Sequence, residues 1–236
     1  MNDNTRRGEQ WQKHVADYLS PRLGGDHAKW REANIAVAVA LWDRNGFARP
    51  GGAYIGARDG YNGYIGDWLT GMCRRVGVDA PEWPASVALA REATAYVTRR
   101  VRASFPGAIE SIRHLSAHGY RLFTASGEYS EELDRYLRGM GVRGLFSRLY
   151  GPNLVETPVE TPKEGPFFYS RLFDDDGVAP ENALVVDDSP DAVQRAIEAG
   201  ATAVLVTGPA SGADGATAVI DRLAKLPRAI ADIDFT

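Results

Sequence analysis

The feature that most constrains this chain is an apolar run, Ala183–Val186, that ends directly in two acids, Asp187 and Asp188. A helical pattern follows at once, over Asp191–Ala199. This succession is typical of a buried parallel strand that delivers its last residues to the carboxyl edge of a sheet, where α/β proteins bind ligands. Two neighbouring carboxylates repel each other unless a cation, a shared proton or water offsets their charge. The pair therefore predicts a polar site at a sheet edge, with a divalent metal as the first candidate to occupy it.

The second half of the chain alternates apolar strand patterns with amphipathic helical patterns. Alternation of this kind favours an α/β fold with a doubly wound parallel sheet. The expected strands are Arg121–Ala125, Leu145–Tyr150, Ala183–Val186 and Ala203–Val206, with a late edge strand at Ala218–Asp221, and the expected helices are Ser130–Met140, Gly165–Phe173 and Asp191–Ala199.

The first hundred residues have a different pattern, with helical segments separated by turns rich in Gly and Pro. The expected helices are Val15–Leu19, Ala28–Trp42, Tyr64–Val76 and Ala85–Val101. The glycine-rich segment Gly46–Gly66 is expected to be a structured loop, and Phe105-Pro106-Gly107 is the expected junction. The sequence thus predicts a helical domain over residues 1–105 and an α/β core over residues 106–236.

Composition restricts the class of protein. The chain has 236 residues, 44% hydrophobic and 25% charged, as in ordinary soluble globular proteins. The net charge of −4 gives no reason to expect nucleic-acid or membrane binding. The single cysteine, Cys73, suits a reducing compartment, and the polar start, Met1–Glu9, lacks the apolar core of a signal peptide. We therefore expect a cytoplasmic protein.

Two further positions could contribute to the same chemistry. Ser126-Gly127 follows a strand, so its hydroxyl and the adjacent N–H groups could bind an oxyanion, although a plain turn explains the pair as well. Lys163 precedes a helical pattern and could neutralise a phosphoryl oxygen, or it could be a solvated loop lysine. Asp187 and Asp188 also have an ordinary explanation, because acids favour a helix N-terminus.

Taken together, the order and spacing of three segments resemble the haloacid dehalogenase-like (HAD) hydrolase superfamily. The segments are Leu122–Gly127, Lys163–Phe168 and Ala183–Pro190. The resemblance implies a HAD-like doubly wound parallel core with an α-helical cap domain, which is the helical first half. It implies Ser126 and Gly127 as phosphate-binding groups, Lys163 as the charge-neutralising lysine, and Asp188 with Asp187 as ligands of Mg²⁺.

One departure from the family pattern lies in the last motif. The family often has a second Asp or Asn further along, where this chain has Ala192, and Asp191 is one residue early.

The family's first motif, a strand ending in Asp-x-Asp that supplies the nucleophilic aspartate, is not found before Ser126. One hypothesis is that the chain begins just past this motif. The other is that Ile35–Asp43 is the first strand, with Asp43 as nucleophile and Asn45 in place of the acid/base. The alanines of that segment favour helix, whereas its alternation favours strand.

The resemblance implies a magnesium-dependent phosphatase that acts on a small phosphorylated metabolite through an aspartyl intermediate. A 2-haloacid dehalogenase, which needs no metal, is the alternative on the same fold, with a haloacid as substrate. An inactive binding protein that lacks the nucleophile is the third hypothesis. The sequence leaves a homodimer open.

Overall fold

The computed structural model describes residues 4–45, 61–151, 167–207 and 215–233, and all structural statements refer to these residues. They divide into two compact units. One unit is helical and contains the chain up to Ala103 together with Glu131–Gly141. The other is an α/β unit that contains Ser104–Ser130 and the chain from Val142 onward. In the described ranges, no helix is both long enough and apolar enough to span a membrane.

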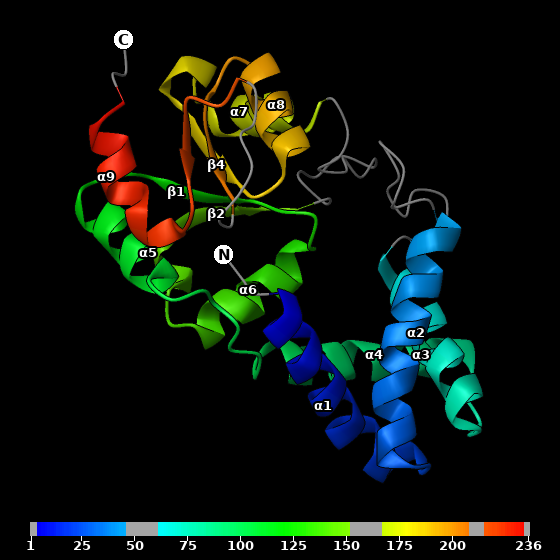
Figure 1. The fold of residues 1–236 in the computed structure, drawn as a ribbon. Coiled ribbons are helices and arrows are strands. Elements are labelled where there is room, and N and C mark those ends of the chain that lie inside the picture. Colours follow the sequence, from blue (N-terminus) through cyan, green and yellow to red (C-terminus); the bar gives the residue numbers. More distant parts are fainter. Residues whose placement is uncertain (1–3, 46–60, 152–166, 208–214, 234–236) are drawn as a thin grey trace. The chain divides into compact units, whose positions relative to one another are not determined.

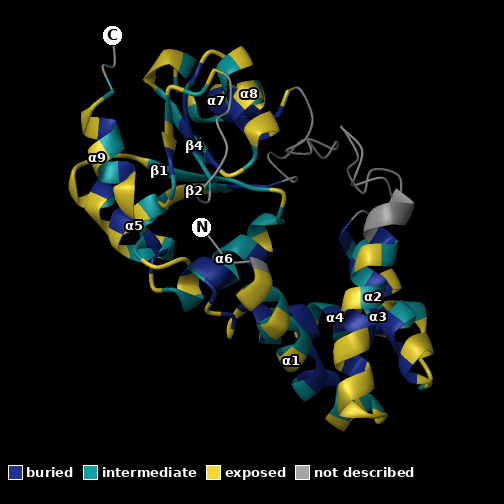
Figure 2. Cartoon of the chain, viewed as in Figure 1, coloured by how far each residue is buried: buried dark blue, intermediate teal, exposed yellow. Residues whose placement is uncertain are grey.

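The helical unit is built from α1 (Asn4–Leu23), α2 (His27–Asn45), α3 (Tyr61–Val76) and α4 (Trp83–Thr98), with most of α6 (Ser130–Gly139). Its helices pack through apolar faces that exclude solvent (Figure 2). The side chains with 0% exposure in this core include Leu19, Trp30, Leu69, Met72 and Val97. Burial of such side chains supplies most of the stability of a helical bundle.

The segment Ile35–Asp43 lies within α2, so the hypothesis that it forms the first core strand is wrong. Its buried residues, Val37 and Leu41, follow Trp30 at helical spacing, whereas Ile35 and Val39 are about half exposed, at 47% and 54%. The alanines between them have high helix propensity, which decides the conformation against the alternating pattern. Asp43 is consequently in the last turns of a helix rather than at the end of a strand, and its side chain lies outside the described part of the chain.

The α/β unit contains two parallel sheets (Figure 1). One sheet pairs β1 (Leu122–Ala125) with β2 (Phe146–Tyr150), and the other has the order β3 (Leu184–Asp187), β4 (Thr202–Val206), β5 (Ala218–Ile220). The helices of this unit are α5 (Ala108–Ala117), α7 (Phe168–Asp176), α8 (Pro190–Glu198) and α9 (Leu226–Ala231), with short 3-10 turns at Arg143–Leu145, Pro180–Asn182 and Leu223–Lys225. The α/β fold class with parallel sheets is confirmed.

Two hydrophobic clusters cover the two faces of these strands. The first brings α7 and α8 against residues of β2, β3 and β4, and it includes Phe168, Phe173, Val193, Val185 and Leu205. The second brings α5 and α9 against the other face, through Leu115, Leu226 and Ile230 around Val204 and Ile220. The unit is therefore a three-layer sandwich, in which both faces of the strands need apolar side chains.

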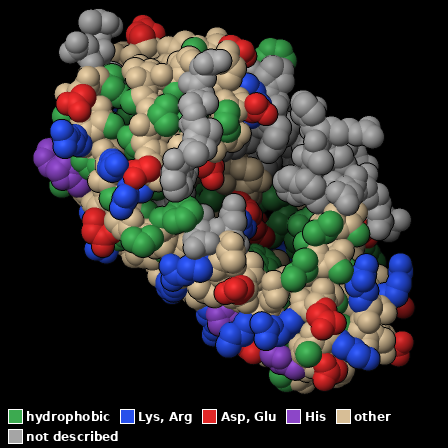
Figure 3. Space-filling model, in the orientation of Figure 1, with side chains coloured by type: hydrophobic (Ala, Val, Ile, Leu, Met, Phe, Trp, Pro, Cys, Tyr) green, Lys and Arg blue, Asp and Glu red, His purple; other side chains and the backbone are tan. Residues whose placement is uncertain are grey.

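Polar surface contacts add little to this packing. Ion pairs between residues four apart join Lys13 to Asp17, Arg138 to Asp134 and Lys225 to Asp221, each with one partner more than half exposed. Basic and acidic side chains lie among each other on the face shown in Figure 3. Exposed pairs of this kind are each worth about 0–1 kcal/mol, so the two cores dominate the stability.

Candidate functional site

The end of β3 carries the two acids of the predicted site. Asp187, the last residue of the strand, is only 7% exposed, and its Oδ1 accepts a hydrogen bond from the Ser189 N–H at 3.0 Å. Ser189 is the N-cap of α8, and its Oγ accepts from the Ala192 N–H at 3.3 Å. Asp188 lies between these two residues and is exposed. The strand thus buries one carboxylate and presents the next to solvent at a helix N-terminus, where negative charge is favoured.

The end of β1 carries the predicted hydroxyl. The Ser126 N–H donates to the Tyr150 carbonyl oxygen at 3.1 Å, and the Ser126 Oγ accepts from the Glu128 N–H at 3.1 Å. The Thr124 Oγ1 donates to the same Tyr150 carbonyl at 3.1 Å. These bonds fix the loop that leaves β1 against the carboxyl end of β2, so Ser126 has a defined position.

Gly151 is a residue of this site that the sequence did not reveal. A Cβ atom at position 151 would lie 2.2 Å from the Glu128 carbonyl oxygen, so only glycine permits the close approach of the two loops. The signal was available in principle, because a glycine directly after a strand pattern indicates a close backbone contact.

The structure brings some of the predicted site residues together in one unit, but not all of them. Ser126 with Gly127, and Asp187 with Asp188, all lie at carboxyl ends of parallel strands in the same unit. Lys163 lies outside the described residues, so its role stays a prediction. Asp43 belongs to the helical unit. Along the described segments, no strand ends in an Asp-x-Asp sequence.

Asp187 and Asp188 offer the carboxylate oxygens that Mg²⁺ binds, but two carboxylates alone do not complete its coordination. Among the described residues, no group of three His, Cys, Asp or Glu side chains could hold a metal ion. Magnesium commonly keeps several waters and takes only one or two protein carboxylates together with substrate phosphate oxygens. Asp187 and Asp188 therefore fit a magnesium ion that is bound jointly with a phosphorylated ligand.

Comparison with known proteins agrees with this geometry. Residues 57–206, which are more than half of the chain, match the family model described as haloacid dehalogenase-like hydrolase. A curated relative, (DL)-glycerol-3-phosphatase 1, mitochondrial, of Arabidopsis thaliana, is 33% identical over 105 residues, which are 43% of this chain. This match spans about a third of the length of that relative (35%).

Solved structures with the same fold include enzymes of two kinds. A HAD phosphatase from Thermococcus onnurineus superposes with a TM-score of 0.54 at 20% identity, over 96% of this chain and 91% of that one. The L-2-haloacid dehalogenase from Xanthobacter autotrophicus gives a TM-score of 0.58 at 15% identity, over 94% of each chain. At these identities the similarity establishes the fold alone.

Proposed function

This chain belongs to the haloacid dehalogenase-like hydrolase family, and from that premise we propose that it is a phosphatase that acts on a small phosphorylated metabolite. The observation that carries the proposal is the acid pair at the end of β3, with Asp187 buried and held by the Ser189 N–H and Asp188 exposed beside it. A haloacid has one negative charge and needs no metal, whereas a phosphate ester has two and gains from a bound cation. The partial match to a curated glycerol-3-phosphatase supports the same choice.

Each site residue has a role in this proposal. The Ser126 hydroxyl and the Gly127 N–H bind phosphoryl oxygens, and Lys163 neutralises their charge. Asp187 and Asp188 would hold Mg²⁺, which would supply Lewis-acid stabilisation of the charge on the phosphoryl group. The covalent aspartyl step needs a nucleophilic carboxylate, and the described strands supply no Asp-x-Asp for it, so the proposal requires that carboxylate to come from outside the described residues.

The test is hydrolysis of p-nitrophenyl phosphate by the purified chain, with Mg²⁺ and with EDTA. We expect metal-dependent turnover that falls at least about 100-fold in Asp188→Asn and in Lys163→Met, because loss of one electrostatic contact to the transition state costs about this much. Asp191→Asn, in the first turn of α8, is the matched control and should retain activity.

Other results would point to the alternatives. Chloride release from 2-chloropropionate that persists in EDTA would identify a dehalogenase instead. Stabilisation by inorganic phosphate without any turnover would identify a binding protein. Asp43→Asn is expected to leave turnover unchanged, because that residue is in α2. An inactive Asp43→Asn variant would instead identify Asp43 as the nucleophile.

A further inference from the structure

Two histidines of α5 form a cluster that the predicted active site does not include. His114 and His118 are four residues apart, and their rings are stacked, with centroids 3.9 Å apart and planes inclined by 31°. Residues with this spacing are neighbours on the surface of a helix. Pairs of histidines at the same spacing bind zinc in helical metal sites, because both rings reach one ion. The pair therefore has the arrangement of a two-point metal ligand.

Both rings are open to solvent, while the helix that carries them is fixed. His114 and His118 are exposed, and histidine side chains lie together on the surface over α5 (Figure 3). On the buried side of the helix, the Ser111 Oγ donates to the Leu223 carbonyl oxygen at 2.9 Å, and Leu115 belongs to the cluster with α9. An ion from solvent can consequently reach the two rings without a movement of the backbone.

The ring of His118 is oriented by a hydrogen bond within the helix. Its Nδ1 lies 2.8 Å from the His114 carbonyl oxygen, which can only accept, so Nδ1 carries the hydrogen. In the neutral ring the lone pair is then on Nε2. Histidines that bind metals commonly donate their other ring N–H to a carbonyl or carboxylate oxygen, which fixes both the tautomer and the ring orientation. The Nε2 of His118 is therefore the expected ligand atom.

The place of the pair on the helix favours a cation. His118 is the C-cap residue of α5, and His114 lies in the last turn. The free carbonyl groups at this end form the negative pole of the helix dipole and stabilise positive charge. The same field also suits a protonated histidine without any metal. The stacked rings and the fixed Nε2 are the features that point to a bound ion instead.

The separation of the rings suits a tetrahedral ion. Zinc bonds to imidazole nitrogens at about 2.0–2.1 Å, so two of them lie roughly 3.4 Å apart, which is close to the distance between the stacked rings. Glu110 is one turn earlier on α5, but in the described ranges no three side chains form a metal-binding group. Two imidazoles with water in the remaining positions are the ligand set that these residues offer.

The pair is separate from the predicted active site. His118 precedes β1 by four residues and lies at the amino end of this strand, whereas Ser126 follows its carboxyl end. Imidazole nitrogens suit Zn²⁺, Cu²⁺ and Ni²⁺, whereas Mg²⁺ prefers oxygen ligands. Metal binding at the pair is therefore independent of whether the chain is a phosphatase.

We propose that His114 and His118 form a surface site for a divalent transition-metal ion of the class that prefers imidazole, with Zn²⁺ as its representative. The ion is held by the Nε2 of His118 and a ring nitrogen of His114. Because these ligands are one helical turn apart, the bound ion clamps the last turn of α5, from which the chain continues into β1.

The test is a calorimetric titration of the full chain with Zn²⁺ in excess Mg²⁺, which leaves imidazoles free. We expect one zinc ion per chain at this site. His114→Ala and His118→Ala should each weaken zinc affinity at least about tenfold, because loss of a ligand costs no less than loss of an outer-shell partner. His27→Ala is the matched control, since this exposed histidine faces Asp17 in the helical unit, and it should bind zinc like the unchanged chain.

A second measurement uses the unchanged chain and needs no variant to fold. In nitrogen NMR spectra of the histidine rings, zinc should shift the Nε2 of His118 and leave its Nδ1–H in place. Two results would overturn the proposal. Zinc affinity that is unchanged in His114→Ala and His118→Ala, or equally weakened in His27→Ala, would exclude a site at this pair. Zinc-dependent shifts confined to other histidines would exclude it as well.

Discussion

The helical unit and the α/β unit differ in how completely each buries its apolar surface. In the helical unit, side chains such as Leu19, Trp30 and Leu69 are 0% exposed, and the buried Trp68 Nε1 donates a 3.0 Å hydrogen bond to the Asn34 Oδ1. In the α/β unit, β4 reaches the same burial but β1 does not. The difference follows from the backbone. A helix satisfies its own hydrogen bonds, whereas a strand depends on neighbours at both edges.

The largest expected effect compares two leucines of the α/β unit. Leu205→Ala empties a fully buried position in β4 and should lower the free energy of unfolding by about 2–5 kcal/mol. Leu122→Ala, in the half-buried β1, should cost clearly less, because the side chain already contacts solvent in part. Urea unfolding followed by circular dichroism measures both. Equal losses would show that β1 is as well covered as β4.

The next prediction concerns the helical unit, where the Tyr61 hydroxyl donates to the Glu132 Oε1 at 2.5 Å and both residues are buried. Burial, assisted by the Glu132 charge, raises the pKa of Tyr61, so its hydroxyl remains a donor. Tyr61→Phe should lower the free energy of unfolding by about 1–3 kcal/mol, because the buried carboxylate loses a donor.

The matched control for this pair is Tyr18→Phe. The Tyr18 hydroxyl donates to the exposed Glu92 at 2.8 Å, where water can replace it, so the loss should be smaller. All five tryptophans precede residue 84, so tryptophan fluorescence follows the helical unit in both variants. If Tyr18→Phe lowered the free energy of unfolding as much as Tyr61→Phe, burial of the Glu132 carboxylate would not be the reason for the larger loss.

Much of the α/β unit could be predicted from local sequence. The run before Asp187 and Asp188 forms a strand with both acids at its carboxyl end. A short apolar run that ends directly before a helix start is typical of a buried strand. The ends of helices were predicted less well: α7 begins at Phe168, whereas the expected start at Gly165 lies outside the described residues. Local patterns locate elements to within a few residues because periodicity, unlike capping, is spread along the chain.

What could not be predicted depends on contacts between distant residues. Helix α6 was expected within the α/β core, yet Glu131–Gly141 belongs to the helical unit, where the Glu131 carboxylate lies 3.1 Å from the Arg91 guanidinium. The indole of Trp11 likewise donates to the Tyr136 hydroxyl. The division of the described strands into a two-stranded and a three-stranded sheet also depends on distant residues. A periodic pattern reports which face of an element is apolar, not which element covers it.

In the α/β unit, a smaller loss of stability is expected from changes at the start of α8. Ser189→Ala removes the N-cap oxygen that accepts from the Ala192 N–H and should cost about 1 kcal/mol in unfolding free energy. Ser189→Asp keeps an acceptor at this position and should retain most of the stability. Circular dichroism in urea measures both variants, and an Ala variant as stable as the wild type would show that the cap contributes nothing.

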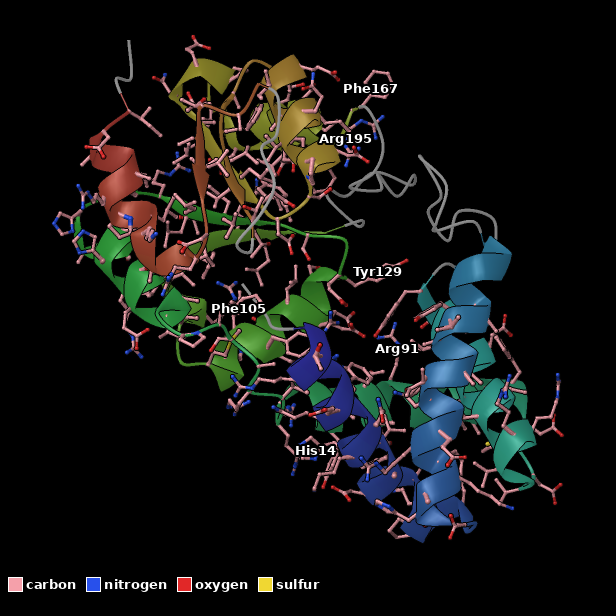
Figure 4. All side chains as sticks on the ribbon, in the orientation of Figure 1. His14, Arg91, Phe105, Tyr129, Phe167 and Arg195 are labelled. Atoms are coloured by element: carbon pink, nitrogen blue, oxygen red, sulfur yellow. The ribbon has the colours of Figure 1, made fainter. Side chains whose placement is uncertain are left out.

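The smallest effect is a pH dependence of the helical unit that arises from His14 on α1 (Figure 4). Burial lowers the pKa of His14 below the ordinary histidine value of 6.5, and the positive charges of Lys13 and Arg100 add to this shift. Asp17, whose Oδ2 lies 3.4 Å from the His14 Nδ1, opposes it. With the folded-state pKa lowered, the unfolded chain binds more protons below pH 6.5. Stability should therefore be full above this pH and fall as the pH drops toward the folded-state pKa.

His14→Gln should flatten the dependence of the free energy of unfolding on pH, measured by urea unfolding followed by tryptophan fluorescence. His118→Gln, in the α/β unit, should leave this dependence unchanged. A slope that survives in His14→Gln would assign the dependence to another group.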